Sequence, residues 1–285
     1  MRFDDPRLSG AVFAATGRSP TGLAPLTGGC IAQVYKVEVD GGDPLVAKVA
    51  PEGGLALEGE MLSYLARESE LPVPAVLHSS DDLLLLEYVA NDGGLTASAE
   101  RHGAELLAAL HGITAPDFGF HKDTLIGPLR QPNPWCPRWL DLFIEHRLLY
   151  MGRIARESGH LPNGTLGRLE QLCAKLDRHI EEPPQACLIH GDVWGGNVLT
   201  RNGRIAAFVD PAIYFADPEI ELAYASLFST FGEPFFARYQ ELRPIAPGFH
   251  EARRDLYTLY PLLVHTALFG GPYGNSVAAI VRRYL

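Results

Sequence analysis

The stretch that runs up to Asp210 constrains the fold more than any other part of the sequence. An apolar, strand-like run leads to Asp192, and Asn197 follows five positions later. Asn202 and Gly203 then separate two further apolar runs, and Asn-Gly in such a place is the strongest short-range signal for a β-hairpin. The stretch therefore predicts a strand, a polar loop and a two-stranded hairpin that ends near Asp210.

The expected register of this hairpin brings the polar side chains together. With a two-residue loop, the expected pairs are Thr200 with Ile205, Val198 with Ala207 and Asn197 with Phe208. Asp210 then lies just beyond, at the open end and beside Asp192. Oxygen ligands grouped in this way suit Mg²⁺ that is bound together with nucleotide phosphates. We therefore predict that Asp192 accepts the proton of an acceptor hydroxyl, and that Asn197 and Asp210 hold Mg²⁺.

Protein kinases have Asp and Asn at this same spacing, and they also need an upstream lysine that is held by a helix carboxylate. Lys48 lies in the apolar strand pattern 45–49. Its partner is Glu58 or Glu60, both in a helical pattern at 55–67. Glu58 falls inside the apolar stripe of that helix, whereas Glu60 falls at its edge. Because an unpaired carboxylate in an apolar stripe is costly, we predict that Glu58 pairs with Lys48.

Two further stretches are predicted to bind the nucleotide. Gly28, Gly29 and Cys30 precede the first long strand, where glycines let backbone amides approach phosphates. An apolar run also leads to Glu87 and Val89, whose backbone groups are placed to contact the edge of adenine. A tight turn and a core strand that ends at a linker are the plainer interpretations of the two stretches. The sequence has no G-x-x-x-x-G-K-[ST] motif, which disfavours a P-loop enzyme.

The first third of the chain mixes strand and helix patterns, and the remainder is mostly helical. Strands are expected at 34–39, 44–49, 75–78 and 83–88. Helices are expected at 55–67, 99–111, 139–157, 166–181, 220–227, 234–242 and 253–268. We therefore expect an α+β fold in two lobes. Residues 1–89 would form a nucleotide-binding lobe with a small antiparallel sheet and one main helix, and residues 90–285 a larger, mostly helical catalytic and substrate-binding lobe.

Composition limits the partners and the compartment. The formal net charge of the 285 residues is −10, and a nucleic-acid partner would favour a basic face instead. No apolar run is long enough to span a bilayer, and the N-terminus lacks the apolar core of a signal peptide. The four cysteines are widely spaced, as in reduced cytosolic proteins. We expect a cytoplasmic protein with no membrane or nucleic-acid partner; monomer and homodimer both stay open.

The motif H-G-D-V-W-G-G-N at 190–197, followed by D-P-A-I-Y at 210–214 and D-P-E-I-E-L at 217–222, resembles the fructosamine-3-kinase (ketosamine-3-kinase) family. The segments 28–31, 71–74 and 256–273 are also similar to that family, so the resemblance covers nearly the whole chain. It implies a two-lobed, protein-kinase-like fold. It further implies that the protein uses ATP and Mg²⁺ to phosphorylate the sugar part of a ketoamine, which primes deglycation.

Carried over by position, the resemblance implies that Asp192 is the base and that Asn197 and Asp210 hold Mg²⁺. In the same way, it implies that Lys48 and Glu58 orient ATP. It also implies that Trp194 borders the sugar site, and it makes Asp217 and Glu219 candidate substrate contacts. Pro218 departs from the arginine expected in many relatives, which puts the fine contacts around Asp217 and Glu219 in doubt.

Several other residues are assigned structural roles. We expect His190 to brace the catalytic loop, with Glu221 as a second brace, and His111 and His265 to be hydrogen-bonded within the fold. Trp135 and Trp139 are expected in the core or between packed lobes, since aromatic side chains usually are.

Two other functions stay open at this point. One is a kinase of the same fold that acts on an aminoglycoside or an amino alcohol, and the other is a nucleotide-binding protein without catalysis. An aminoglycoside site would favour a strongly acidic cleft, whereas a ketoamine site should combine polar and aromatic groups. The complete set of predicted catalytic residues speaks against a protein without catalysis.

Overall fold

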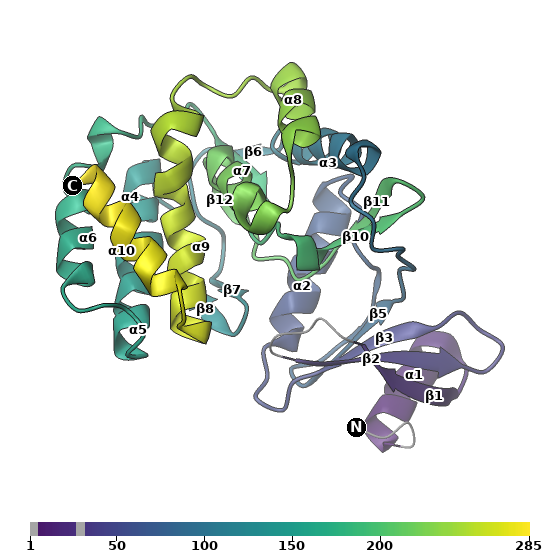
Figure 1. Ribbon diagram of the computed structural model, residues 1–285. Coiled ribbons are helices and arrows are strands. Elements are labelled where there is room, and N and C mark those ends of the chain that lie inside the picture. Colours follow the sequence, from purple (N-terminus) through teal and green to yellow (C-terminus); the bar gives the residue numbers. More distant parts are fainter. Residues whose placement is uncertain (1–4, 27–31) are drawn as a thin grey trace.

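The computed structural model describes residues 5–26 and 32–285 (Figure 1). The N-terminal part combines an antiparallel sheet with two helices, and helices make up most of the rest, so the expected α+β class is confirmed. Within the described ranges, no helix is both long and apolar enough to cross a lipid bilayer.

The N-terminal part is a five-stranded sheet with two helices. The strand order is β1-β2-β3-β5-β4. The strands are β1 (Pro20–Pro25), β2 (Gln33–Val39), β3 (Leu45–Val49), β4 (Val76–Ser79) and β5 (Leu83–Glu87). The helices are α1 (Pro6–Thr16) and α2 (Leu55–Glu68). The side chain of Asp5 caps α1 by accepting the Arg7 N–H, and Pro6 has the fixed φ that suits a first helical residue.

The two helices cover opposite faces of this sheet. Along β3, Leu45, Ala47 and Val49 face the apolar cluster that includes α1. Val46 faces the second cluster, which includes the apolar side of α2. Because side chains alternate along a strand, Lys48 shares the face of Val46 and points toward α2. The sheet therefore places this lysine between itself and the helix that carries Glu58.

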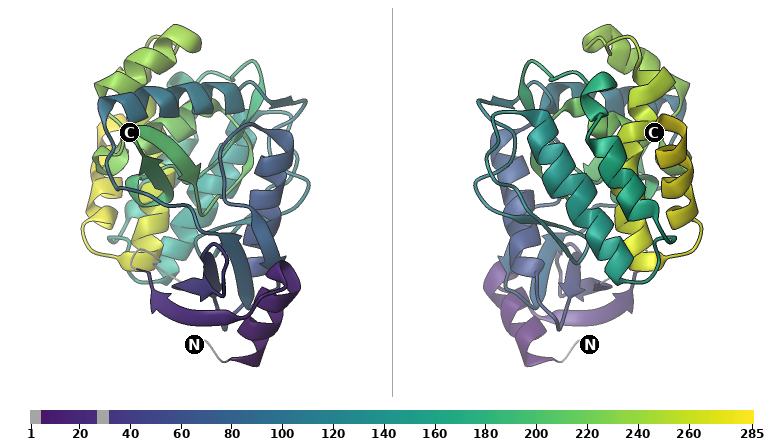
Figure 2. Two further views of the ribbon diagram at one scale, coloured as in Figure 1. Left: turned by 90° about the vertical axis from the view of Figure 1, so that its right-hand side faces the viewer. Right: turned by 90° about the vertical axis from the view of Figure 1, so that its left-hand side faces the viewer.

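The C-terminal part contains eight of the α-helices described. They are α3 (Ala97–Leu110), α4 (Trp139–Phe143), α5 (Tyr150–Glu157), α6 (Thr165–Cys173), α7 (Pro218–Ser226), α8 (Glu233–Leu242), α9 (Arg254–Phe269) and α10 (Tyr273–Tyr284). A π-helical segment, Ile144–Leu149, joins α4 to α5. Figure 2 shows these helices on one side of the molecule and the N-terminal sheet on the other.

Short strands position the chain inside the helical part. A three-stranded sheet has the order β12-β9-β6, with β6 (Thr114–Ala115), β9 (Ala186–Ile189) and β12 (Tyr214–Ala216). Two hairpins are formed by β7 (Thr124–Ile126) with β8 (Leu129–Gln131) and by β10 (Val198–Arg201) with β11 (Arg204–Phe208). Every residue of β9 and β12 is buried. These two strands therefore fix both ends of the segment from His190 to Ile213, which contains the predicted catalytic loop and the β10–β11 hairpin.

The connection from the sheet to the helical part is fastened to the β10–β11 hairpin. The Asp92 N–H donates to the Thr200 carbonyl oxygen (2.8 Å). The Asp92 carboxylate accepts the Asn202 N–H (2.8 Å). Asp92 lies between β5 and α3, close after the predicted lobe boundary at residue 89.

All four expected strands and the expected helix at 55–67 are present. The short strands β6, β7, β8 and β12 were not expected, and neither were three further elements. These are α1, β1 and α10. The expected helix at 139–157 is divided by the π-helical segment, and the expected helix at 166–181 ends at Cys173. Trp139 is fully buried as expected, but the prediction for Trp135 is wrong, because that side chain is 47% exposed on an irregular loop.

Candidate active site

A glycine in the left-handed region turns the chain from β9 into the polar loop. Gly191 has a φ of +86°, and a Cβ there would lie 2.1 Å from the Ala212 carbonyl oxygen, so no larger residue fits. His190 is fully buried, and its Nδ1 accepts the Asp192 N–H (3.3 Å). Burial lowers the pKa of His190, which favours the neutral ring that such an acceptor requires. These contacts support the prediction that His190 braces the loop.

The hairpin after this loop has the expected turn. Asn202 and Gly203 both have positive φ, 53° and 70°, as a type I′ turn requires. Thr200 pairs with Ile205, as expected. The Asn-Gly signal therefore located the turn and the first pair correctly.

The register changes beyond that pair because β11 contains one extra residue, a β-bulge. Val198 pairs with Phe208 and not with Ala207, so that prediction was wrong. The expected pairing of Asn197 with Phe208 was wrong for the same reason. The Asn197 carbonyl oxygen instead accepts the Val209 N–H (3.0 Å). This hydrogen bond still fixes Asn197 beside the residue that precedes Asp210.

Asp192 and Asn197 are held together directly. The Asn197 Nδ2 donates to the Asp192 Oδ2 (2.8 Å) and to the Asp192 carbonyl oxygen (2.9 Å). Burial raises the pKa of Asp192 to about 7; the hydrogen bond from the Tyr224 hydroxyl opposes this rise, and the charge of Asp210 adds to it. A carboxylate with such a pKa is suited to take up a proton near neutral pH.

Lys48 joins the sheet, α2 and the end of the hairpin. It is 7% exposed, and its Nζ lies 2.6 Å from the Glu58 Oε1 and forms a second ion pair with Asp210. Burial opposes the charge of Lys48, but the two carboxylates outweigh burial and raise its pKa. Glu60 pairs with Lys122 instead. The contact predicted between Lys48 and Glu58 is therefore present.

The donor set near Asp210 fits a magnesium ion that is bound partly by phosphates. Among residues 5–26 and 32–285, no three His, Cys, Asp or Glu side chains cluster closely enough to hold a metal alone. Mg²⁺ needs only one or two protein carboxylates when phosphates and waters complete its shell. Asp210 supplies a carboxylate, and Asn197 has an amide oxygen left because its nitrogen is used on Asp192.

The buried carboxylate of Glu221 is hydrogen-bonded to the start of the catalytic loop. The Glu221 side chain is 1% exposed, and it accepts the Gly191 N–H (2.7 Å) and a hydrogen bond from the His111 Nε2 (2.8 Å). The other ring nitrogen of His111 bonds to the Tyr239 hydroxyl (2.7 Å). Burial alone would raise the pKa of Glu221, but the hydrogen bond and charge of His111 outweigh it and lower that pKa. Glu221 thus contacts the loop as expected, and His111 is hydrogen-bonded as expected.

An aromatic cluster borders the loop near Trp194. The Trp194 ring lies edge-on to Phe228, with 6.4 Å between centroids. Phe228 also contacts His265 (5.0 Å) and Tyr273 (6.2 Å), and it is 45% exposed. The His265 Nδ1 bonds to the Pro261 carbonyl oxygen (2.8 Å), so this histidine is hydrogen-bonded as expected. The cluster gives the loop an aromatic, partly exposed border.

The two carboxylates at the start of α7 are engaged by protein groups. Asp217 accepts the Glu219 N–H (2.9 Å) and the Tyr257 hydroxyl (2.5 Å). Glu219 forms a two-point ion pair with Arg253, at 2.6 and 2.8 Å. These contacts give both residues a structural role, and a contact of either one with a substrate stays a prediction.

The remaining nucleotide predictions are less constrained by the structure. Glu87 ends β5, and its N–H donates to the Ala75 carbonyl oxygen (2.9 Å). Val89 follows in the connection to α3 and is half-buried. The predicted phosphate-binding residues Gly28, Gly29 and Cys30 lie outside the described residues.

Three residues near the loop were not anticipated from the sequence. Tyr224 bonds to Asp192 from α7. The Thr230 Oγ1 accepts the Gly195 N–H (2.9 Å). Phe228 adopts a positive φ of 55°, which no local signal indicates. Tyr224 lies in α7, and Phe228 and Thr230 lie in the segment just after that helix. Their nearness in sequence to the D-P-E-I-E-L motif was the only signal for a role beside the loop.

A lysine–glutamate pair on a small sheet and helix, joined to an Asp-x₄-Asn loop and a following Asp, defines a protein-kinase-like phosphotransferase that uses ATP as co-substrate. The sequence profile described as Fructosamine kinase matches residues 10–285. This chain belongs to the fructosamine kinase family.

Individual relatives agree with this placement. A protein of Synechocystis sp. described as a probable ketoamine kinase is 32% identical over 270 residues, which cover 91% of this chain and 89% of the relative. The chloroplastic protein-ribulosamine 3-kinase of Oryza sativa subsp. indica is 32% identical, over 93% of this chain and 79% of the relative. A crystal structure from Thermobifida fusca, described as a putative fructosamine-3-kinase, is 33% identical with a TM-score of 0.85, over 96% of this chain and 97% of that one.

Proposed function

We propose that this protein transfers the γ-phosphoryl group of ATP to a sugar hydroxyl of a ketoamine of the fructosamine or ribulosamine type. The observation that carries the proposal is the convergence of five side chains from β3, α2, the loop after β9 and the end of the β10–β11 hairpin: Lys48, Glu58, Asp192, Asn197 and Asp210. The names of the relatives support the ketoamine as acceptor.

Each residue has a defined task in this reaction. Lys48, held by Glu58, orients the phosphates of ATP, and Asp210 and Asn197 hold Mg²⁺. The bound ion neutralises charge on the phosphates. Asp192 takes the proton from the attacking hydroxyl as its oxygen bonds to the γ-phosphorus and the bond to ADP breaks. His190 and Glu221 hold the loop so that Asp192 keeps its position.

The border of the loop favours a sugar acceptor over a polycationic one. Trp194, Phe228, His265 and Tyr273 form an aromatic surface, whereas an aminoglycoside site would favour a strongly acidic one. Ligand pockets combine such aromatic surface with a few polar groups that fix orientation. Trp194 is therefore the proposed contact for the sugar ring, with Asp217 and Glu219 as more distant candidates.

The nucleotide contacts and the organisation of the chain complete the proposal. Residues 1–89 form the nucleotide-binding lobe and residues 90–285 the catalytic and substrate-binding lobe. Gly28, Gly29 and Cys30 approach the phosphates, and the backbone groups of Glu87 and Val89 contact adenine. The enzyme works in the cytoplasm without a nucleic-acid or membrane partner.

The test is ADP release with ATP and Mg²⁺, comparing fructosyl- and ribulosyl-amines with aminoglycosides and amino alcohols. Selective turnover of the ketoamines is expected. Asp192→Asn should lower kcat by a factor of about 100 or more, because it removes the base. Nucleotide affinity should change little in that variant. Equal kcat in the variant and the parent would refute the assignment of Asp192, and turnover of another acceptor alone would refute the ketoamine.

A further inference from the structure

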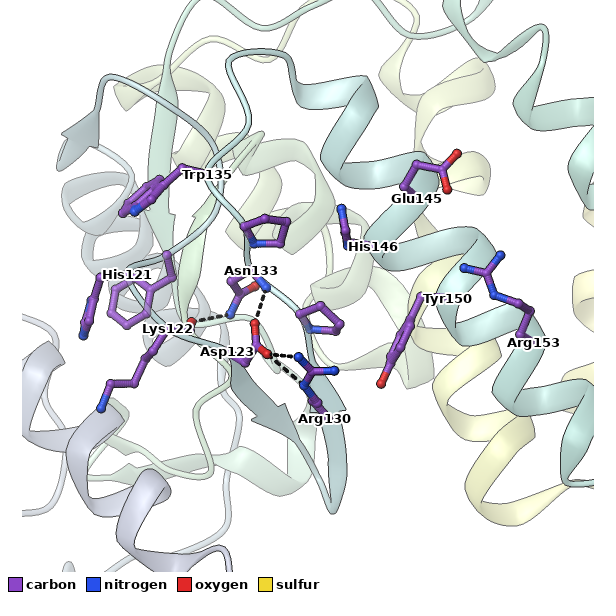
Figure 3. A pocket seen from close by; sticks show the side chains of 13 residues that line it. His121, Lys122, Asp123, Arg130, Asn133, Trp135, Glu145, His146, Tyr150 and Arg153 are labelled. Carbon is purple, nitrogen blue, oxygen red and sulfur yellow. Dashed lines mark hydrogen bonds and ion pairs between the residues drawn. The ribbon is translucent and has the colours of Figure 1, made fainter.

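A cleft in the C-terminal part lies outside the candidate active site. It has a volume of about 590 Å³ (Figure 3). One side is lined by the segment 120–135, which contains the β7–β8 hairpin and is called the loop 120–135 below, and the other by the π-helical segment and α5. Its described lining residues include none of the five residues that converge at the candidate active site. The cleft is therefore a separate cavity and not an extension of that site.

Two exposed side chains of opposite charge line this cleft without an ion-pair partner. Glu145 belongs to the π-helical segment and Arg153 to α5, and neither forms an ion pair with any residue of 5–26 or 32–285. The other charges differ in this respect. Arg130 is paired with Asp123, and Lys122 is paired with Glu60. The cleft therefore offers one unpaired cation and one unpaired anion to a ligand.

Aromatic surface accompanies these two charges. In Figure 3, Tyr150 lies between Arg130 and Arg153, and Trp135 stands on the opposite wall. Trp135 is 47% exposed, although the sequence predicted a core residue. An exposed aromatic ring in a concave wall is typical of ligand pockets, and the volume lies in their usual range.

The backbone of one wall is unusual in the same place. Single π-helical turns inside α-helices occur frequently at functional sites. Arg147 of this segment is fully buried, with its guanidinium 3.9 Å from the Tyr214 ring centroid. Its neighbours Glu145 and His146 line the cleft. The π-helical segment thus carries one buried arginine and two residues that line the cleft.

We propose that this cleft binds a free amino acid with an aromatic side chain. Arg153 pairs with the carboxylate of the ligand and Glu145 with its ammonium group. The ring of the ligand packs against Tyr150, which lies beside Arg153 in the cleft. A zwitterion satisfies both unpaired charges at once, which a simple anion or a simple cation does not.

Occupancy of the cleft reaches the nucleotide site through the loop 120–135; this step rests on the proposed function. Phe120 packs edge-on against Tyr64 of α2 (4.9 Å), and Lys122 pairs with Glu60 of the same helix. The Gln131 Nε2 donates to the carbonyl oxygen of Ala212, two residues after Asp210 (3.0 Å). A ligand that holds this loop in place stabilises α2, and with it Glu58. ATP should therefore bind more tightly when the cleft is filled.

The binding step can be tested without ATP or any acceptor. Ligand-observed NMR titrations would compare L-phenylalanine with phenylpropionate, which lacks the ammonium, and phenethylamine, which lacks the carboxylate. Arg153→Ala should weaken L-phenylalanine and phenylpropionate by about fivefold and leave phenethylamine unchanged. Glu145→Gln should weaken L-phenylalanine and phenethylamine and leave phenylpropionate unchanged. Arg156→Ala removes an exposed arginine of α5 that does not line the cleft, and it should change none of the three.

Three outcomes would overturn the proposed site. They are no binding of L-phenylalanine at about 20 mM, well above a millimolar dissociation constant; equal affinities in all variants; and competition with a ketoamine acceptor, which would place the amino acid at the active site. The coupling is tested separately, by the dissociation constant of ATP with and without L-phenylalanine. We expect about fivefold tighter ATP binding, lost in Arg153→Ala. An unchanged constant would remove the coupling and leave the binding site standing.

Discussion

Two neighbouring glycines in the catalytic loop differ in what surrounds them. A Cβ on Gly196 would lie 2.4 Å from the Trp194 Cη2, inside the space that the indole ring fills. A Cβ on Gly195 would meet its nearest atom, the Thr230 Oγ1, at 3.8 Å, which is an ordinary contact. Neither glycine has a positive φ, so an alanine would not strain the backbone. The position of the Trp194 ring thus depends on Gly196.

Gly196→Ala should displace the Trp194 ring and raise KM for the ketoamine by about tenfold, because binding energy to the sugar is lost. KM for ATP should stay within about twofold. Steady-state kinetics with each substrate varied in turn gives both values. Gly195→Ala is the matched control and should resemble the parent. If Gly196→Ala leaves KM for the ketoamine unchanged, Trp194 does not contact the sugar.

The two glutamates of α2 provide a second pair of matched variants. Glu58→Gln should raise KM for ATP by about tenfold, because it removes a half-buried carboxylate that pairs with the buried Lys48. Glu60→Gln removes an exposed ion pair with Lys122 and should change KM for ATP by less than about threefold. Equal effects of the two substitutions would show that Glu58 has no special role in positioning Lys48.

At the scale of elements, the start of α7 contains an unusual carboxylate. Asp217 is 6% exposed, and it caps the helix while accepting the Tyr257 hydroxyl. Burial, together with the nearby charge of Glu219, raises the pKa of Asp217 to about 7. The folded protein therefore holds a proton on Asp217 at pH values where the unfolded chain, near 3.8, has lost it.

This difference makes a contribution to stability that is full below about pH 4 and falls as pH rises toward 7. Asp217→Asn keeps a capping side chain but cannot ionise. The free energy of unfolding of the variant, relative to the parent, should therefore increase between pH 4.5 and pH 8, by about 1 kcal/mol or more. Urea unfolding at both pH values measures it. Asp177→Asn, at an exposed position, is the control. If the free energies of unfolding of Asp217→Asn and the parent differ by the same amount at both pH values, the pKa of Asp217 is not raised.

The sequence predicted elements best where the pattern was strongly periodic. The Asn-Gly dipeptide located the β10–β11 turn, but nothing in the pattern marked the bulge that shifts Val198 onto Phe208. Strand β1 begins and ends with proline and contains Gly22, a composition typical of loops, so only its pairing with β2 makes it a strand. The π-helical segment carries an ordinary helical pattern, and nothing in that pattern marks its i→i+5 hydrogen bonds.

At the scale of the whole molecule, Arg147 joins the helical part to the chain near the active site. Its guanidinium donates to the Pro132 carbonyl oxygen (2.7 Å) and to the Asn133 side chain, and it stacks on Tyr214. These hydrogen bonds are made to neutral groups. The residue therefore connects the π-helical segment, the loop after β8 and strand β12 through a single side chain.

Arg147→Met should lower the free energy of unfolding by about 3 kcal/mol, because it leaves buried acceptors at Pro132 and Asn133 without a donor. Urea unfolding monitored by fluorescence measures the change. Arg156→Met replaces an exposed arginine and should stay within about 0.5 kcal/mol of the parent. A loss below about 1 kcal/mol in Arg147→Met would mean that packing alone holds the segment.

The candidate site was largely predictable because its residues lie at fixed spacings in recognisable elements. Asp192, Asn197 and Asp210 follow one strand and one hairpin, and the apolar stripe of α2 selected Glu58 over Glu60. The contacts from α7 and the loop behind it could not be predicted, because they depend on how distant segments pack. Tyr224 and Thr230 reach the loop in this way, and so do the partners that engage Asp217.

The fastening of Asp92 to the β10–β11 hairpin bears on how nucleotide leaves the protein. Asp92 is attached to the hairpin that follows Asn197, and the Phe208 N–H of the same hairpin donates to the Pro72 carbonyl oxygen of the N-terminal part (2.8 Å). The segment 88–91 lies between β5 and Asp92 and contains Val89, a proposed contact of adenine. A nucleotide that contacts Val89 would therefore touch a segment whose far end is fixed to the hairpin beside the proposed magnesium ligands. Its departure would release that segment and leave the hairpin held at Pro72.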